Sequence, residues 1–446
     1  MSIVFIVGIR PNFIKLAPLI HECKIRNMDY KIIHTGQHYD YNLSKIFFDE
    51  LEIPEPDYYL NTKSGMHGYQ TGKMTARIEK KLIELKPSMS IVIGDNNSTL
   101  AGALASVKLQ IPCAHVEAGL RLFDKNQPEE INRYMVDSCS DLLFPPTHYA
   151  AKRLSEESFP SEKIFMNGNV LIDELRIIIR KIRDSMMMNK YNLEKKDYIL
   201  ITIHRPFNVD NITNLTNIIN ILQSFSDNFK LFFPIHKRTE KRLKQFGLWK
   251  KVSSLKNVII TEPLGYVEFI TILKNSKMII TDSGGVIAES AYLEVPCIVI
   301  DTVSEWVEAL ENGSVILAGC EPNIINKICT NTLKKIEEGW TVSNPYPYWD
   351  KTASKSIINI INSHIKNKYK IPTYNFINGV YETRIYHINF TLTLLDLKKH
   401  IPKDTSLISV YDTEGKPILI FENMQIKKDF IIRLWGPRHS LDSFKI

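Results

Sequence analysis

Residues 3–15 read IVFIVGIRPNFIK, in which five apolar residues are followed at once by a glycine and an Arg-Pro pair. Five consecutive apolar residues have the length of a strand that is buried on both faces. Pro11 is typical of the first turn of a helix, where its missing N–H costs no hydrogen bond. A buried strand that passes directly into a helix indicates an α/β protein with a parallel sheet.

The same alternation of short apolar runs and helical stretches continues along the chain, and it begins afresh in the second half. Two such series in tandem predict two Rossmann-like, doubly wound parallel-sheet domains that face a cleft. The predicted strands of the first series are Ile3–Val7, Lys31–Thr35, Ser90–Ile93, Pro112–Val116 and Leu142–Phe144. Those of the second are Tyr198–Ile203, Lys230–Ile235, Asn257–Thr261, Met278–Thr281 and Pro296–Ile300.

These patterns predict domains at residues 1–170 and 171–351, a helix at 352–370, and an appended module at 374–446. The helix is expected over Thr352–Lys368. The sequence pattern of the module differs from that of the preceding residues and predicts a small β-rich or α+β fold of unknown role. Its predicted strands are Ile385–Leu394, Leu407–Tyr411, Pro417–Phe421 and Phe430–Leu434.

The composition excludes several classes of protein. With 44% hydrophobic and 24% charged residues, the chain of 446 residues is neither disordered nor fibrous. Membrane attachment is not expected, because no apolar run approaches the roughly 20 residues of a spanning helix. The net charge of +7 is spread along the chain, which favours a small anionic ligand over nucleic acid. Six cysteines without Cys-x-x-Cys pairs predict reduced thiols in the cytoplasm and no metal site.

Candidate anion-binding groups follow the predicted strands, where ligands of open α/β sheets bind. Arg10 and Lys15 lie at the start of the first helix. In the second half, Ser283, Gly284 and Gly285 begin a helix whose free N–H groups suit a diphosphate. Glu289, one turn on, could hold a ribose diol.

Candidate acids and bases occupy similar positions. Asp95 and Glu117 each follow a strand, and Glu129 begins a helix beside Glu130. Acids at such positions often serve only as helix caps or dipole partners. Three acid-bearing segments in one half nevertheless favour general acid–base chemistry.

Two histidines follow consecutive strands of the second half. His204 and His236 each precede a basic residue, which favours an anion-binding or acid–base role over the structural role that is usual for a single histidine. Because the sequence has neither a Gly-x-Gly-x-x-Gly nor a Walker motif, it predicts no dinucleotide or ATP site.

In combination, these motifs resemble those of the non-hydrolysing UDP-N-acetylglucosamine 2-epimerases, over residues 1 to about 370. The segments that carry the resemblance are Gly8–Lys15, Thr35–His38, Gly94–Asp95, His115–Arg121, Pro128–Arg133, His204–Asn208 and Asp282–Glu289. Ser64–Gly68 with Gln70–Met74 is similar to the archaeal-type branch. The resemblance implies the two-domain GT-B fold, which the helix at 352–370 would close.

The resemblance also implies roles for single residues. The family's active-site positions correspond to Arg10, Lys15, Asp95, Glu117, Glu129 and His204, and its UDP-binding segment to Ser283, Gly284, Gly285 and Glu289. The predicted catalytic residues are therefore Asp95, Glu117, Glu129 and His204. The predicted substrate- and UDP-binding residues are Arg10, Lys15, His236, Ser283, Gly284, Gly285 and Glu289.

The implied activity is interconversion of UDP-GlcNAc and UDP-ManNAc for surface-glycan or polysaccharide precursors. The reaction is an anti elimination of UDP to 2-acetamidoglucal followed by re-addition. It would need neither NAD nor a metal, and UDP would be retained as an intermediate. The implied protein is a cytoplasmic homodimer whose partner is a UDP-sugar.

Some residues depart from the family pattern. The segment Asp301–Glu308 lacks the usual arginines, and its Glu305, Trp306 and Glu308 resemble branches that act on UDP-6-deoxy-L-HexNAc or UDP-2,3-diacetamido uronates. Tyr39 stands where bacterial members carry an arginine for an activating UDP-GlcNAc.

Four alternatives therefore stay open: an epimerase of a modified UDP-sugar, a hydrolysing 2-epimerase, a GT-B glycosyltransferase, and a non-catalytic nucleotide-sugar-binding protein. Hydrolysis would release free sugar, a transferase would require an acceptor, and a silent protein would have lost at least one of the acid–base residues.

Overall fold

The computed structural model describes most of the chain, and the residues divide into two compact units. The described residues are 2–37, 48–182, 184–350, 352–366, 381–387, 392–401, 406–411, 417–418, 425–427 and 431–437. The first unit comprises Met1–Leu154 and Pro160–Lys366, and the second comprises Ser155–Phe159 and Asn367–Ile446. His38 and Tyr39, which the sequence analysis named, lie outside the described residues.

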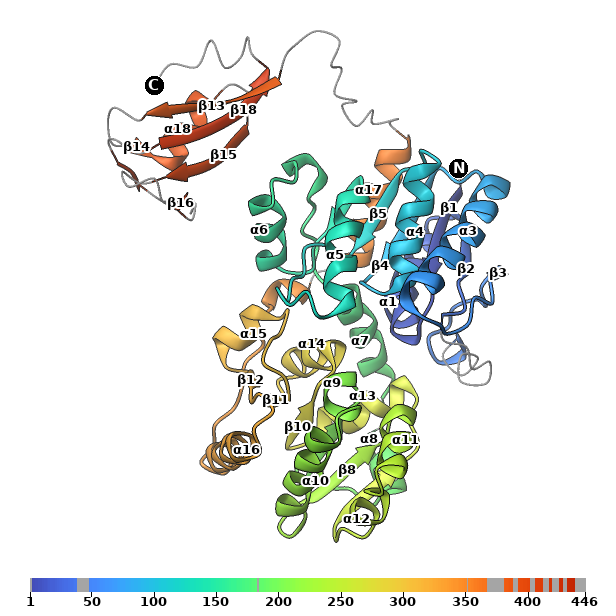
Figure 1. Ribbon diagram of the computed structural model, residues 1–446, viewed down its shortest axis with the longest axis vertical. Coiled ribbons are helices and arrows are strands. Elements are labelled where there is room, and N and C mark those ends of the chain that lie inside the picture. The colour runs from blue at the N-terminus through green and yellow to red at the C-terminus, as the bar shows by residue number, and fades with distance from the viewer. Residues whose placement is uncertain are drawn as a thin grey trace. The chain divides into compact units, whose positions relative to one another are not determined.

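The first domain is built on a parallel sheet with the strand order β3-β2-β1-β4-β5-β6 (Figure 1). Its strands are β1 (Ser2–Val7), β2 (Asp29–His34), β3 (Tyr58–Tyr59), β4 (Met89–Ile93), β5 (Cys113–Val116) and β6 (Leu142–Phe144). Its helices are α1 (Arg10–Ile25), α3 (His67–Leu85), α4 (Asn97–Lys108), α5 (Pro128–Cys139), α6 (His148–Glu156) and α7 (Val170–Lys181). The strand order reverses between β1 and β4, so a ligand site is expected at their carboxyl ends.

The second domain repeats this architecture, with the strand order β12-β11-β10-β7-β8-β9. Its strands are β7 (Tyr198–Thr202), β8 (Lys230–Pro234), β9 (Val258–Thr261), β10 (Met278–Thr281), β11 (Cys297–Val299) and β12 (Val315–Leu317). Its helices are α8 (Asp184–Lys190), α9 (Pro206–Val209), α10 (Ile212–Ser226), α11 (Lys237–Gln245), α12 (Trp249–Ser253), α13 (Tyr266–Asn275), α14 (Gly284–Tyr292), α15 (Val307–Asn312) and α16 (Pro322–Glu337). The reversal here lies between β7 and β10.

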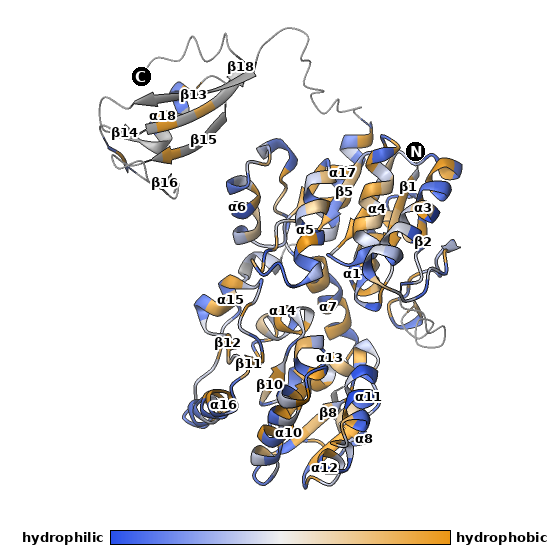
Figure 2. Ribbon diagram, in the orientation of Figure 1, coloured by the Kyte–Doolittle hydropathy of each residue, from blue (hydrophilic) through white to orange (hydrophobic). Residues whose placement is uncertain are grey.

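The prediction of two doubly wound parallel sheets is confirmed, and each predicted strand of both halves is present with its ends shifted by at most two residues. Apolar residues concentrate on the strands and on the inner faces of the helices (Figure 2). The sequence analysis did not predict β3 and β12, which are two and three residues long.

After the second sheet, the chain returns to the first domain through α17 (Ala353–Lys366). Asp173 of α7 accepts hydrogen bonds from the backbone N–H groups of Ala353 (3.2 Å) and Ser354 (2.6 Å), which anchors the start of this helix. Arg26 Nε donates to Asn359 Oδ1 at 3.1 Å. The predicted helix is thus present and packs on the first domain, while the predicted domain boundaries at residues 170, 351 and 370 stay predictions.

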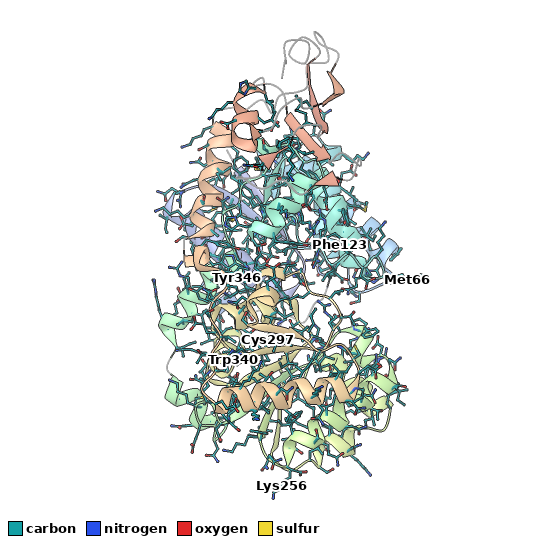
Figure 3. All side chains as sticks on the ribbon, turned by 90° about the vertical axis from the view of Figure 1, so that its left-hand side faces the viewer. Met66, Phe123, Lys256, Cys297, Trp340 and Tyr346 are labelled. Carbon is teal, nitrogen blue, oxygen red and sulfur yellow. The ribbon has the colours of Figure 1, made fainter. Side chains whose placement is uncertain are left out.

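An aromatic cluster joins the end of the second domain to the first. The Tyr346 ring, labelled in Figure 3, stacks on Trp349 with 3.8 Å between ring centroids. Trp306 meets Trp349 edge-on at 5.7 Å, and Trp349 Nε1 donates to the Pro146 carbonyl at 2.8 Å. These buried rings hold the segment around Trp306 against the first domain.

The second unit is an α+β module by its described residues. A four-stranded antiparallel sheet has the order β13-β18-β15-β16, and β14 pairs with β17. The elements are β13 (Tyr381–His387), β14 (Leu392–Thr393), α18 (Leu394–His400), β15 (Ser406–Tyr411), β16 (Pro417–Ile418), β17 (Gln425–Ile426) and β18 (Ile431–Pro437). The single strand predicted over Ile385–Leu394 is wrong at its end, because a helix begins at Leu394.

No helix within the described ranges is both long and apolar enough to cross a membrane.

Glu174 of α7 is a buried acid whose two carboxylate oxygens have no hydrogen-bond partner among the described residues. Burial raises the pKa of Glu174 from 4.5 to about 8, against the opposing charge of Lys181. The folded protein therefore holds this proton at neutral pH, whereas the unfolded chain releases it above pH 4.5. The free energy of unfolding should consequently fall by up to about 1.4 kcal/mol per pH unit between pH 4.5 and 8.

We expect Glu174→Leu to raise the free energy of unfolding at pH 7 by about 1–3 kcal/mol, because an apolar side chain carries no proton to lose. Urea denaturation of both proteins at pH 5 and pH 7.5 checks this, with Glu337→Leu on the exposed face of α16 as the control. An unchanged pH dependence in Glu174→Leu would contradict the prediction.

Candidate active site

The loops after β1 and β4 are fastened together by Asn12 of α1. Its Oδ1 accepts hydrogen bonds from the backbone N–H of Gly8 (3.2 Å) and from Asn96 Nδ2 (3.0 Å), and its Nδ2 donates to the Ile93 carbonyl (3.0 Å). A Cβ at Gly8 would overlap Ser98 Oγ, so only glycine fits beneath α4. This arrangement fixes the start of α1, and with it Arg10 and Lys15, beside the loop that carries Asp95.

Lys15 and Glu117 form a buried ion pair between α1 and the end of β5. Burial alone would lower the pKa of Lys15, but neighbouring acids, Glu117 the strongest, raise it above its ordinary value. Glu117 has a φ of 75°, which is unfavourable for a residue with a side chain and is often found at functional sites. Its Oε1 is buried without a hydrogen-bond partner in the described part of the chain, so this oxygen is available to a ligand.

Asp95 is held by Arg133 of α5. Arg133 donates to Asp95 Oδ2 from Nη2 (2.7 Å) and from Nε (3.0 Å). Burial would raise the pKa of Asp95, but the positive charges of Arg133 and Lys15 bring it below its ordinary value. Asp95 is therefore a fixed carboxylate that remains about one third exposed.

The two acids that begin α5 have different environments. Glu130 is fully buried and accepts hydrogen bonds from the backbone N–H groups of Leu122 and Phe123, both at 2.9 Å. Glu129, which the sequence singled out, is exposed at the second helical residue. Adjacent helical residues point about 100° apart, which explains how neighbouring acids take separate roles.

In the second domain, Asp282 positions His204. Its carboxylate accepts hydrogen bonds from the backbone N–H groups of His204 (3.0 Å) and Arg205 (2.9 Å) and from Asn208 Nδ2 (3.0 Å). His204 Nδ1 lies 3.2 Å from Asp282 Oδ1. Burial opposes ionisation of Asp282, but these partners hold its pKa below the ordinary value. The His204 ring is thereby oriented, with part of it exposed.

His236 lies beside His204, with 5.4 Å between the ring centroids. It caps α11, because its Nδ1 accepts a hydrogen bond from the backbone N–H of Arg238 at 3.2 Å. Burial, and after it the charges of His204 and of Arg10 in the first domain, lower the pKa of His236 to about 4. The two domains therefore bring Arg10 and both histidines into one neighbourhood.

The start of α14 has the features of an anion-binding helix terminus. Ser283 is the N-cap, and a Cβ at Gly285 would meet no neighbouring atom. Glu289, one turn on, is buried and accepts a hydrogen bond from the Tyr266 hydroxyl at 2.9 Å. Burial raises the pKa of Glu289 to about 7, against the charge of Lys15. Lys15 of the first domain thus lies close enough to influence the second.

Several contacts cross between the two domains at this junction. Arg133 Nη2 lies 3.6 Å from Glu305 Oε1, and Arg205 Nη1 donates to Gln127 Oε1 at 3.4 Å. A third contact is made by Glu50, whose Oε2 accepts from the backbone N–H at the start of α13 at 2.8 Å. These contacts bring Arg133, which holds Asp95, close to Glu305 of the second domain. Glu129 has no hydrogen bond or ion pair with these groups in the described residues.

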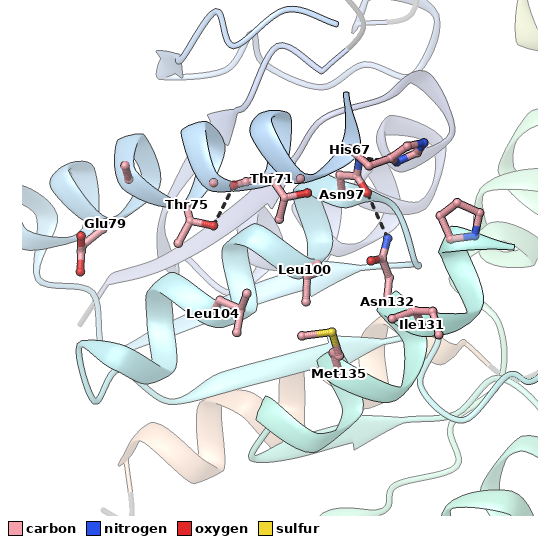
Figure 4. A pocket seen from close by; sticks show the side chains of 14 residues that line it. His67, Thr71, Thr75, Glu79, Asn97, Leu100, Leu104, Ile131, Asn132 and Met135 are labelled. Atoms are coloured by element: carbon pink, nitrogen blue, oxygen red, sulfur yellow. Dashed lines mark hydrogen bonds between the residues drawn. The ribbon is translucent and has the colours of Figure 1, made fainter. Parts of the chain in front are cut away.

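A separate groove of about 640 Å³ runs along α3, α4 and α5 on the first domain (Figure 4). One of its lining residues, Asn132, donates to the Asp95 carbonyl at 2.8 Å and to Asn97 Oδ1 at 3.3 Å. The side chains that line it include His67, Thr71, Thr75, Leu100, Leu104 and Met135.

In the described part of the chain, no three His, Cys, Asp or Glu side chains are grouped to hold a metal ion. The expectation that the protein uses neither a metal nor NAD stays a prediction.

Sequence reasoning missed several residues of the site, notably Arg133, Asp282 and Glu305. Arg133 and Asp282 are within motifs that the sequence analysis quoted, but a motif does not reveal which side chain a residue holds. Glu305 was visible only as part of a segment that departs from the family pattern.

Two Rossmann-like domains, with acids on one and an anion-binding helix terminus on the other, define a protein of the GT-B class that is suited to a nucleotide sugar. The model of the UDP-N-acetylglucosamine 2-epimerase family matches residues 21–362, and the chain belongs to this family.

Relatives and solved structures agree with this assignment. A protein of Methanococcus maripaludis named as a UDP-N-acetylglucosamine 2-epimerase homolog is 47% identical over 72% of this chain and 89% of its own length. The UDP-2,3-diacetamido-2,3-dideoxy-D-glucuronate 2-epimerase of Pseudomonas aeruginosa is 39% identical over 75% and 93%. The Methanocaldococcus jannaschii UDP-GlcNAc 2-epimerase, crystallised with UDP-GlcNAc and UDP, has a TM-score of 0.75 and 42% identity, over 81% of this chain and 99% of that one. The predictions of the family and of the GT-B fold are confirmed.

Proposed function

We propose that the protein is a non-hydrolysing 2-epimerase that interconverts UDP-GlcNAc and UDP-ManNAc. One observation carries the proposal: Arg133, which holds Asp95 of the first domain, lies 3.6 Å from Glu305, and Glu305 lies against Gly284 at the start of α14. The Lys15–Glu117 pair is part of the same group of charges, because Lys15 interacts electrostatically with Asp95, Glu305 and Glu289. Acid–base groups and a diphosphate site are both needed, because the reaction breaks and remakes the bond between the sugar and UDP.

The proposed reaction has two balanced halves. A carboxylate removes the C2 proton while the C1–O bond breaks, which releases UDP and leaves 2-acetamidoglucal. The C2 carbon is then protonated from the opposite face, and a UDP oxygen adds to C1 again. No atom is gained or lost and the sugar is not oxidised, so the cycle needs no NAD. We assign the acid–base steps to Asp95, Glu117, Glu129 and His204.

The UDP must stay bound while it is detached from the sugar. We assign this task to the cations Arg10 and Lys15, to His236, and to the N–H groups that follow Ser283, Gly284 and Gly285 at the start of α14. The raised pKa of Lys15 keeps it cationic at neutral pH, which suits a diphosphate. Glu289 would accept hydrogen bonds from the ribose hydroxyls.

The test is incubation of the full-length protein with UDP-GlcNAc in deuterated water, followed by NMR. Epimerisation through removal of the C2 proton incorporates deuterium at C2 and yields UDP-ManNAc. Free N-acetylmannosamine with an equal amount of UDP would instead indicate a hydrolysing enzyme, and no labelling of any UDP-sugar would indicate a binding protein.

A second candidate function is epimerisation of a modified UDP-sugar. It is favoured by the similarity to the P. aeruginosa enzyme and by the site of Trp306, whose Nε1 donates to the Gly284 carbonyl at 2.8 Å beside the proposed diphosphate position. The same labelling assay with a UDP-2,3-diacetamido uronate and a UDP-6-deoxy-L-HexNAc distinguishes the candidates by their relative kcat/KM.

Assembly and location are part of the proposal. We propose a homodimer, supported by exposed apolar side chains on the helices that border the groove, among them Tyr69 on α3 and Ile131 on α5. Light scattering coupled to gel filtration tests it.

A cytoplasmic location is supported by six cysteines that form no disulfide.

The appended module is expected to be dispensable for catalysis, because every proposed site residue precedes residue 310 and α17 already packs on the first domain. A chain that ends at Lys370, a position outside the described residues, should keep kcat within a few-fold of the full-length value. Its oligomeric state, solubility or thermal midpoint should change instead. A folded truncate with an unaltered oligomer and no epimerisation would contradict this.

A further inference from the structure

Glu305 lies in the segment between β11 and α15, and its side chain is only 7% exposed. Its Oε1 lies 3.6 Å from Arg133 Nη2, across the junction between the domains. On the other side, a Cβ at Gly284 would overlap the same oxygen. The carboxylate therefore lies between α5 and the first turn of α14, close to where the sugar must join the diphosphate.

One carboxylate oxygen of Glu305 lacks a hydrogen-bond donor. Its Oε2 is buried and has no hydrogen-bond partner among the described residues. Arg133 donates its hydrogen bonds of 2.7 and 3.0 Å to Asp95. The 3.6 Å between Arg133 Nη2 and Glu305 Oε1 is too long for a hydrogen bond. An ionised oxygen buried without a donor is costly, and the buried Asp282, by contrast, accepts three short hydrogen bonds.

The charge of Glu305 restricts what could supply the missing donor. A carboxylate accepts hydrogen bonds and repels anions, so a diphosphate, which has no donor at neutral pH, does not fit against Oε2. A sugar ring offers hydroxyl donors, and an acetamido group offers an N–H. Glu117 Oε1, another buried oxygen without a partner among the described residues, faces the same need, and Lys15 interacts electrostatically with both Glu117 and Glu305.

We propose that Glu305 is a sugar-binding residue, whose Oε2 accepts a hydrogen bond from a hydroxyl or acetamido N–H of the UDP-sugar. This inference rests on the proposed function. The contact holds the ring between the carboxylates of the first domain and α14, and the absence of a side chain at Gly284 leaves room for it. Glu305 thereby distinguishes a UDP-sugar from UDP alone.

The test compares binding of UDP-GlcNAc and of UDP by calorimetry in the full-length wild type, Glu305→Gln and Glu305→Asp. Glutamine removes the charge, and aspartate withdraws it by one carbon. We expect both variants to bind UDP-GlcNAc at least ten-fold more weakly and UDP within two-fold of the wild type. In turnover, KM should rise more than kcat falls.

Glu308→Gln is the matched control. Glu308 is on the same segment, and its Oε2 is likewise buried without a partner among the described residues. Unlike Glu305, it is held by the first domain, because its Oε1 accepts a hydrogen bond from the backbone N–H of Tyr149 at 2.9 Å. We expect both affinities to stay within two-fold of the wild type in this variant.

Equal weakening of UDP-GlcNAc and UDP in the Glu305 variants, or no weakening of either, would overturn the inference and leave Glu305 as an ion-pair partner of Arg133. A wild type that binds UDP-GlcNAc but neither labels nor epimerises any UDP-sugar would instead refute the proposed function. If Glu305→Gln does not fold, Glu305→Asp, which keeps the charge but withdraws the carboxylate, must by itself show the same selective loss.

Discussion

Replacement of Glu117 by glutamine is expected to lower the turnover of UDP-GlcNAc by roughly 10²–10⁴-fold, the usual contribution of a general acid or base. The variant keeps the shape of the side chain but can neither take up a proton nor balance the charge of Lys15. Asp95→Asn and Glu129→Gln are expected to lose turnover in the same range. UDP should still bind to each, because none of the groups assigned to the diphosphate (Arg10, Lys15, His236 and the start of α14) is replaced.

Single-turnover kinetics and calorimetric titration with UDP measure the two effects separately. Glu262→Gln, an exposed acid of the second domain, is the control and should retain wild-type turnover. Glu129 provides the sharpest comparison, because it is exposed while Glu117 is buried in an ion pair. Near-wild-type rates in Glu117→Gln, Asp95→Asn and Glu129→Gln together would refute the site assignment.

The sequence was sufficient to predict the two sheets, because parallel strands buried on both faces appear as continuous apolar runs that turns interrupt. It also predicted where ligands would bind, since residues that directly follow such strands must lie at one edge of the sheet. Lys15, Asp95 and Glu117 were found in this way, and the structure places all three together.

The sequence could not predict the partners of those residues. Asp282 and Glu130 resemble helix-capping acids in the sequence, and only the fold shows that one orients His204 while the other shapes the loop at Leu122. The contact of Glu305 with Arg133 joins residues 172 positions apart. No local sequence pattern predicts such a contact, because the contact depends on how the two domains pack against each other.

The motif around His115 illustrates the same limit, because much of it is structural. Asp137 of α5 is fully buried, and its Oδ1 lies 2.6 Å from His115 Nδ1. Its Oδ2 lies 2.7 Å from Arg121 Nη2 and accepts the backbone N–H of Gly119 at 3.1 Å. Burial opposes ionisation of Asp137, but His115 and Arg121 hold its pKa below the ordinary value. This network fixes the loop on both sides of Glu117.

Asp137→Asn is therefore expected to lower the free energy of unfolding by about 3–5 kcal/mol, the usual cost of removing one partner from a buried ion pair. Arg121 would remain buried without its counter-charge, so the loss should exceed that of one neutral hydrogen bond. Urea denaturation at pH 7 measures it, and Asp124→Asn, in an external loop, should change stability by less than about 0.5 kcal/mol. If Asp137→Asn were as stable as the control while turnover fell, Asp137 would act in catalysis, and the structural role argued from its three partners would be wrong.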